Sequence, residues 1–141
     1  MLLTINCYNI IQCDAVVGCG VNAETFSSIL KRFMEVLVEG DFTIVMENVR
    51  FHHTAVNNVD HFPYYVKVLP GYSSFLNPCE EAFSMPKNRV RRDGVPRGSN
   101  DLVRRISDSC VGIHVNPLSN FLAHAETFSN KCLNLEDIFR D

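Results

Sequence analysis

Two glutamates, Glu47 and Glu80, follow hydrophobic segments, and their side chains suit metal-assisted chemistry. Mg²⁺ and Mn²⁺ prefer oxygen ligands, and Mg²⁺ is usually held by one or two protein carboxylates together with water and phosphate. Paired ions of this kind activate a water molecule and stabilise the leaving oxygen of a phosphodiester. Such sites usually use three or more carboxylates, so the spacing of two is a weak signal. The alternative interpretation is that each carboxylate is solvated surface.

The elements that must position these carboxylates are two short strands. Residues 42–46 form a continuous apolar run, typical of a strand buried on both faces of a parallel sheet. Residues 64–69 form a second strand. Glu47 directly follows the first strand, and Glu80 comes shortly after the second. Because sites gather at the carboxyl ends of parallel strands, we expect the two carboxylates to reach the same rim of the sheet.

The rest of the chain predicts an α/β fold. Residues 2–18 indicate an antiparallel hairpin, and Asn22 is expected to cap an amphipathic helix. Residues 80–90 have a helical pattern, which Pro86 must kink or shorten. The order of the elements describes an α/β layer with a mixed sheet. We divide the chain into a core at 1–92, a linker at 93–99, and C-terminal helices of the same domain at 100–141.

Basic residues are concentrated in one segment of the chain. The 141 residues carry a formal net charge of −3. Residues 87–105 hold seven Lys and Arg against two Asp, so this segment is +5 and the remainder is −8. Such asymmetry is typical of a surface that binds nucleic acid. The alternative is a solvated basic loop and helix.

Six cysteines are present, and none forms a Cys-x-x-Cys pair, so no zinc-ribbon spacing occurs. We predict a reducing intracellular setting in which the cysteines pack as small buried hydrophobes. No signal peptide is evident, and no apolar stretch approaches the ~20 residues that cross a bilayer. Two alternatives involve the histidines. One is a zinc site made by His52, His53 and His61 with Cys79, whose spacing fits no common pattern. The other is a nucleophile pair of Cys79 with His52, to which no general-base context points.

Two blocks, FTIVMENVRFHH at 42–53 and VKVLPGYSSFLNPCEEAF at 66–83, together resemble the mariner-like transposase DDE superfamily. The family has a ribonuclease H type of fold. Its pattern is a strand ending in Asp-Asn with a nearby His, then Leu-Pro-x-Tyr-Ser, then Asn-Pro-x-Glu and a helix with an aromatic residue and a Lys. Each piece is weak alone, but their order and spacing are specific. Segments 20–26 and 113–128 are also similar to the family's first helix and its closing helices, so the resemblance covers most of the chain.

The resemblance implies a DNA endonuclease and strand transferase that uses Mg²⁺ or Mn²⁺. Glu80 matches the third catalytic carboxylate, and Glu47 stands where the second, normally Asp, is found. Glu81 matches a position that is not catalytic, so its expected role is to favour the helix N-terminus. The expected supporting residues are Asn48, His52 and Asn77. The expected DNA contacts are Lys87, Arg89, Arg91 and Arg92.

The chain also departs from the family pattern. Glu47 replaces Asp, and a displacement of ~1 Å in an active site can cost ~100-fold in rate. The family's first catalytic Asp lies on a strand before the hairpin, whereas Met1 begins the hairpin here. We therefore predict a ribonuclease H-like mixed sheet, flanked by helices, that lacks its first, central strand and is truncated at the N-terminus.

Two functions remain open for such a chain. One is a DNA-directed endonuclease of the nucleus, and the other is a catalytically inactive transposon-derived fragment or domesticated DNA-binding or interaction module. DNA is the expected partner, no membrane partner is expected, and homo-oligomerisation is left open.

Overall fold

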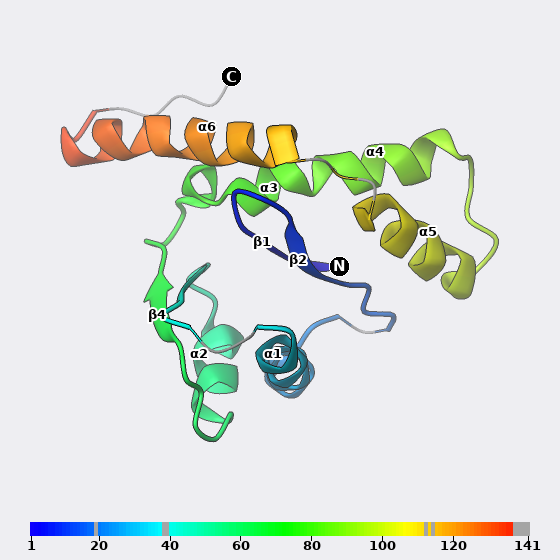
Figure 1. Ribbon diagram of the computed structural model, residues 1–141, viewed down its shortest axis with the longest axis horizontal. Coiled ribbons are helices and arrows are strands. Elements are labelled where there is room, and N and C mark those ends of the chain that lie inside the picture. The colour runs from blue at the N-terminus through cyan, green and yellow to red at the C-terminus, as the bar shows by residue number, and fades with distance from the viewer. Residues whose placement is uncertain (19, 38–39, 112, 114, 137–141) are drawn as a thin grey trace. The chain divides into compact units, whose positions relative to one another are not determined.

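The computed structural model describes residues 1–18, 20–37, 40–111, 113 and 115–136. They form two compact units. The continuous unit is Val16–Ser73, and the split unit joins Met1–Ala15 to Ser74–Asp141. Each unit combines helices with a two-stranded sheet (Figure 1). The predicted α/β class is confirmed at this level.

The split unit begins with the predicted hairpin. Strands β1 (Leu2–Ile5) and β2 (Ile10–Asp14) pair in antiparallel register. The Asn6 side-chain oxygen accepts hydrogen bonds from the backbone N–H groups of Tyr8 and Asn9, at 2.9 and 2.8 Å. An Asn side chain that bonds the backbone two and three residues later stabilises a tight turn. The connection between the strands is therefore set by local sequence.

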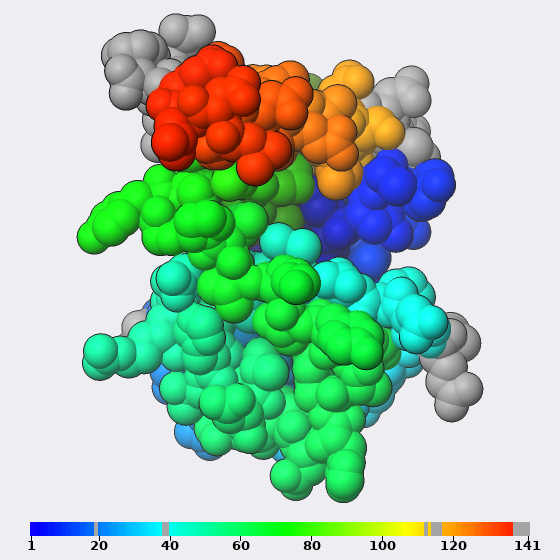
Figure 2. Space-filling view, turned by 90° about the vertical axis from the view of Figure 1, so that its left-hand side faces the viewer, coloured from blue at the N-terminus to red at the C-terminus, as the bar shows by residue number. Residues whose placement is uncertain are grey.

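Helices make up the rest of the split unit. They are the 3-10 turn η1 (Ser74–Leu76), α3 (Pro78–Ala82), α4 (Ser84–Arg92), α5 (Ser99–Val111) and α6 (Val115–Leu133). Helix α3 lies along α6, and α4 lies beside α5 (Figure 1). In the space-filling view, the orange and red surface of α6 covers the green segment that contains η1 and α3 (Figure 2). In the part of the chain that the structure describes, no helix is long and apolar enough to cross a membrane.

The helix predicted at 80–90 is two helices, which meet at Phe83. Pro86 is the third residue of α4, where its missing N–H has no intrahelical partner to lose. The backbone N–H of Lys87 then donates to the Phe83 carbonyl at 3.3 Å. Pro86 thus fixes the start of a new helix and does not kink a longer one.

The core of the split unit takes one residue from each of four elements. Leu3 of β1, Ala82 of α3, Cys110 of α5 and Leu118 of α6 pack together, and Leu118 and Ala82 have no exposed surface. Partly buried side chains surround them: Ile5, Ile10, Cys13, Phe83, Ile106, Ile113 and Phe121. This cluster fastens the hairpin to the C-terminal helices.

The continuous unit is built on helix α1 (Ala23–Val36). As predicted, Asn22 caps this helix, and its side chain accepts a hydrogen bond from the Thr25 N–H at 2.8 Å. Buried positions recur at spacings of three and four, which places them on one face of the helix. They are Phe26, Ile29, Leu30 and Phe33.

Helix α2 (Arg50–Asn57) packs against α1. The buried Ser27 hydroxyl of α1 donates to the carbonyl of Ala55 in α2 at 3.2 Å. Ala55 has no exposed surface, which allows the two helices to approach closely. The pair of helices forms the core of this unit.

Strands β3 (Thr43–Met46) and β4 (Tyr65–Val68) pair in parallel, as predicted. The prediction that the first of them is buried on both faces is wrong, because Val45 of β3 is 59% exposed. Parallel strands are buried when helices cover both faces of a larger sheet, and two short strands are too few for that. Among the described residues the strands form two separate pairs in place of one mixed sheet.

Candidate functional site

Glu47 follows β3 directly and is half-buried. Its backbone carbonyl lies 3.0 Å from Nδ1 of His52. A carbonyl oxygen only accepts hydrogen bonds, so Nδ1 carries the proton. The His52 ring stacks on Phe26 of α1, with ring centres 4.4 Å apart. His52 is therefore a hydrogen-bond donor to the Glu47 backbone, and it holds the chain at the end of β3.

Asn48 lies next to Glu47, and its side chain is exposed. The Asn48 side-chain oxygen lies 3.0 Å from Nε2 of His53. Both His52 and His53 thus have partners in the segment that connects β3 to α2. This arrangement gives Asn48 a role in local structure, and a role in supporting a metal site stays a prediction.

The end of β4 lies beside the end of β3. The backbone N–H of Leu69 donates to the carbonyl of Met46 at 2.9 Å, which extends the parallel pairing by one residue. The chain therefore leaves β4 next to Glu47. From there it runs through the turn at 70–77 toward Glu80.

Glu80 and Glu81 both lie in the first turn of α3. Asn77 caps this helix by accepting a hydrogen bond from the Cys79 N–H at 3.1 Å. Glu80 is exposed, whereas the half-buried Glu81 carboxylate contacts Nδ1 of His124 in α6. The helix-start position predicted for Glu81 is confirmed, and the contact with α6 is an additional role. Asn77 acts as a helix cap.

The two predicted metal ligands belong to different units, Glu47 to the continuous unit and Glu80 to the split unit. A shared rim therefore stays a prediction. Across the described ranges, no three or more His, Cys, Asp or Glu side chains group so that they can hold a metal ion. Carboxylate oxygens suit Mg²⁺ or Mn²⁺ chemically, but these residues do not supply the three-carboxylate set that the resemblance implies.

Helix α4 carries the predicted DNA-contacting residues. Pro86 and Val90, four residues apart, are buried and face the core of the unit. The basic side chains occupy the rest of the helix circumference and are all exposed: Lys87, Arg89, Arg91 and Arg92. A helix with one apolar stripe leaves the remaining surface for charged groups. The α4 cations, as we call these four, form a basic surface.

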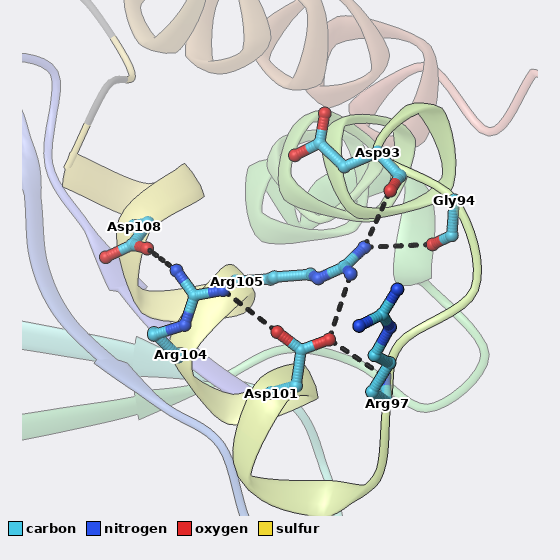
Figure 3. A network of polar contacts seen from close by, with 7 residues as sticks. All are labelled: Asp93, Gly94, Arg97, Asp101, Arg104, Arg105 and Asp108. Atoms are coloured by element: carbon cyan, nitrogen blue, oxygen red, sulfur yellow. Dashed lines mark hydrogen bonds and ion pairs between the residues drawn. The ribbon is translucent and has the colours of Figure 1, made fainter.

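The guanidinium groups of Arg104 and Arg105 are bound within the protein, in a network around Asp101 (Figure 3). Asp101 accepts hydrogen bonds from the Arg97 backbone N–H at 2.8 Å and from the Arg105 and Arg104 guanidinium groups at 2.9 Å each. Arg104 also pairs with Asp108 at 3.2 Å. Arg97 takes part through its backbone alone, so five cations of the segment lie outside this network: the exposed Arg97 guanidinium and the four side chains of α4.

Arg105 links the end of α4 to α5. Its guanidinium donates to the backbone carbonyls of Asp93 and Gly94 at 2.9 and 3.0 Å, and only 17% of its side chain is exposed (Figure 3). The backbone hydrogen bond from Arg97 and the bond from Arg105 lower the pKa of Asp101 to about 2. The network therefore keeps Asp101 ionised at all but very acid pH.

A hollow of about 360 Å³ lies where α4 meets α5. Its lining residues are Arg89, Asp93, Arg104, Arg105, Asp108 and Ser109. Three arginines and two aspartates give it a mixed charge, and Arg104 and Arg105 are already paired. Arg89 belongs both to the lining of this hollow and to the α4 cations.

Sequence reasoning did not predict the contact between two cysteines of the split unit. Sγ of Cys110 in α5 lies 2.6 Å from Sγ of Cys13 in β2. The prediction that the cysteines are buried is wrong for most of those described. Only Cys110 is buried, while Cys7, Cys13, Cys79 and Cys132 are partly exposed, and Cys19 lies outside the described residues. Local spacing gave no signal because the contact joins residues that are 97 apart.

Comparison with known proteins gives no match to a family model, a curated protein or a solved structure. The resemblance to the mariner-like transposases therefore depends on the motif residues alone, and it stays a prediction.

Proposed function

We propose that this chain is a DNA-binding module that holds phosphates through α4, a non-catalytic relative of the DDE transposases it resembles. The observation that carries the proposal is the exposure of all four α4 cations, while Arg104 and Arg105 are paired within the protein. Lys and Arg contacts to phosphates supply most of the affinity in non-specific DNA binding. A DNA partner also brings the expectation of a nuclear location.

The dimensions of α4 support this role. An α-helix with its side chains is about 10–12 Å across, which the ~12 Å wide major groove admits, and the nine residues of α4 give it a length of about 13 Å. The exposed cations surround the helix except at its buried stripe, so several can reach phosphates at once. A competing explanation is that cations in the last turn stabilise the helix C-terminus electrostatically.

The salt dependence of binding separates the two explanations. Each phosphate contact contributes about 0.9 to the slope of log K against log salt, so four contacts contribute about 3.6. We expect a labelled duplex of arbitrary sequence to bind about 100-fold more weakly at 200 mM than at 50 mM salt. A variant with all four α4 cations changed to Gln should lose this dependence. Fluorescence anisotropy across a salt series measures both slopes.

A matched variant removes four exposed cations outside α4. Its substitutions are Lys31→Gln, Arg50→Gln, Lys67→Gln and Lys131→Gln. The net charge changes by the same amount, but the slope should stay close to that of the unsubstituted chain. Equal losses in the two variants, or no binding by the unsubstituted chain, would rule out α4 as the DNA surface.

Metal-dependent nicking of DNA is the second candidate function. It is favoured by the parallel β3–β4 pairing, which places the end of β4 beside Glu47. It predicts relaxation of supercoiled plasmid with Mg²⁺ or Mn²⁺, lost in Glu80→Gln and retained in Glu81→Gln. Absence of nicking with both metals, in a preparation with helical circular dichroism, would eliminate this candidate and leave DNA binding untouched.

A further inference from the structure

Two cysteines in the split unit are placed for covalent chemistry with each other. Cys13 lies in the middle of the hairpin pairing, opposite Leu3, and Cys110 lies near the end of α5. Their sulfur atoms are 2.6 Å apart. The sulfurs of a disulfide are about 2.05 Å apart, so the bond needs a movement of roughly half an ångström.

The two thiols differ in environment. Cys110 is buried, with 7% of its surface exposed, and it donates a hydrogen bond to Cys13. That hydrogen bond lowers the pKa of Cys13, although burial and the nearby Asp14 carboxylate oppose it. The same pairing, together with burial, raises the pKa of Cys110. The partly exposed Cys13 is therefore the better thiolate, and Cys110 is the protonated partner behind it.

We propose that Cys13 and Cys110 are a redox pair that reacts with small disulfides of the glutathione class and closes an intramolecular disulfide. The reaction uses neither the α4 cations nor Glu47 and Glu80, and its test needs neither DNA nor metal.

The reaction takes place in two exchange steps. The Cys13 thiolate, whose proton has gone to solvent, attacks one sulfur of the small disulfide, forms a mixed disulfide and releases one thiolate. Cys110 gives its proton to that thiolate and attacks Sγ of Cys13, which releases the second thiolate. This second thiolate takes a proton from solvent. The protein loses two electrons and two protons, and one disulfide becomes two thiols.

The new bond connects β2 to α5 across a separation of 97 residues. It joins two elements that already meet in the core around Leu118. Oxidation therefore fastens the hairpin to the C-terminal helices without changing their packing. We expect the oxidised chain to unfold at a higher urea concentration than the reduced chain.

Peptide mapping of the full chain tests the proposal. The reduced protein is incubated with glutathione and glutathione disulfide in varied ratio, quenched in acid, alkylated, and digested with trypsin and Asp-N. Cleavage before Asp14 and Asp108 separates Cys13 from Cys19 and releases a peptide that carries Cys110. We expect one linked pair of peptides, 1–13 with 108–131, lighter by two hydrogens than the sum of the separate peptides.

Cys7 shares the first of these peptides, so a variant assigns the bond. The link should persist in Cys7→Ser and disappear in Cys13→Ser. A link from Cys110 to Cys7, or full alkylation of Cys13 and Cys110 in a large excess of glutathione disulfide, would overturn the proposal. Mapping of the unsubstituted chain decides the matter even if the Cys13 variant fails to fold.

Discussion

Replacing Leu118 with Ala is expected to weaken the split unit more than any exposed substitution in the same helix. Leu118 has no exposed surface, and it meets Leu3, Ala82 and Cys110 from three other elements. Leu-to-Ala changes in cores cost about 2–5 kcal/mol, and the cost rises when neighbours cannot close the cavity. Because four elements meet at this side chain, we expect Leu118→Ala to lower the free energy of unfolding by about 3 kcal/mol. That is a large part of the 5–15 kcal/mol that stabilises a typical protein.

Urea unfolding followed by far-ultraviolet circular dichroism measures this cost, and it suits a chain without Trp. With a urea slope of about 2 kcal/mol/M, a loss of 3 kcal/mol lowers the midpoint by about 1.5 M. Leu133→Ala is the matched control, because Leu133 is in the same helix and 81% exposed. It should cost less than about 0.5 kcal/mol. Similar midpoints for the two variants would show that the core does not lie around Leu118.

Two further predictions concern the cap of α1 and the Asp101 network. Asn22→Ala should cost about 1 kcal/mol in urea unfolding because the Thr25 N–H loses its acceptor, whereas Asn22→Ser, which keeps a capping oxygen, should cost only a few tenths. Since the folded state lowers the pKa of Asp101 to about 2, its contribution to stability is present above pH ~4 and is lost as the pH falls toward 2. The difference in urea midpoint between the unsubstituted chain and Asp101→Asn should therefore shrink over that interval, and a constant difference from pH 5 to 2 would contradict the assignment.

Local signals predicted the elements of this fold well. The Asn22 cap and the spacing of apolar residues in α1 are properties of one turn of chain, and the structure confirms both. The hairpin follows from two apolar runs around a turn, and the parallel β3–β4 pair follows from two more. Pro86 signalled a break in the helical pattern, although the break occurs three residues earlier, because proline is tolerated within a first helical turn.

Tertiary relations were much less predictable. The apolar run at 42–46 shows that a strand forms there, but the exposure of Val45 depends on how many strands join the sheet. The same limit applies to the candidate site. Cys13 with Cys110 and Glu81 with His124 come together only through packing of segments distant in sequence. The roles predicted for Glu47 and Glu80 depend on a resemblance to a family, and they await the nicking assay.

The division of one unit into two stretches of chain affects how the protein is made. Leu3 belongs to the first stretch, and its core partner Leu118 is synthesised roughly 6–23 s later at about 5–20 residues per second. The hairpin must therefore wait at the ribosome with the apolar face around Leu3 uncovered, and exposed apolar surface of this kind promotes aggregation and chaperone binding. The continuous unit has all its residues well before then. Vectorial synthesis thus favours an order in which the middle of the chain folds first and its two ends meet last.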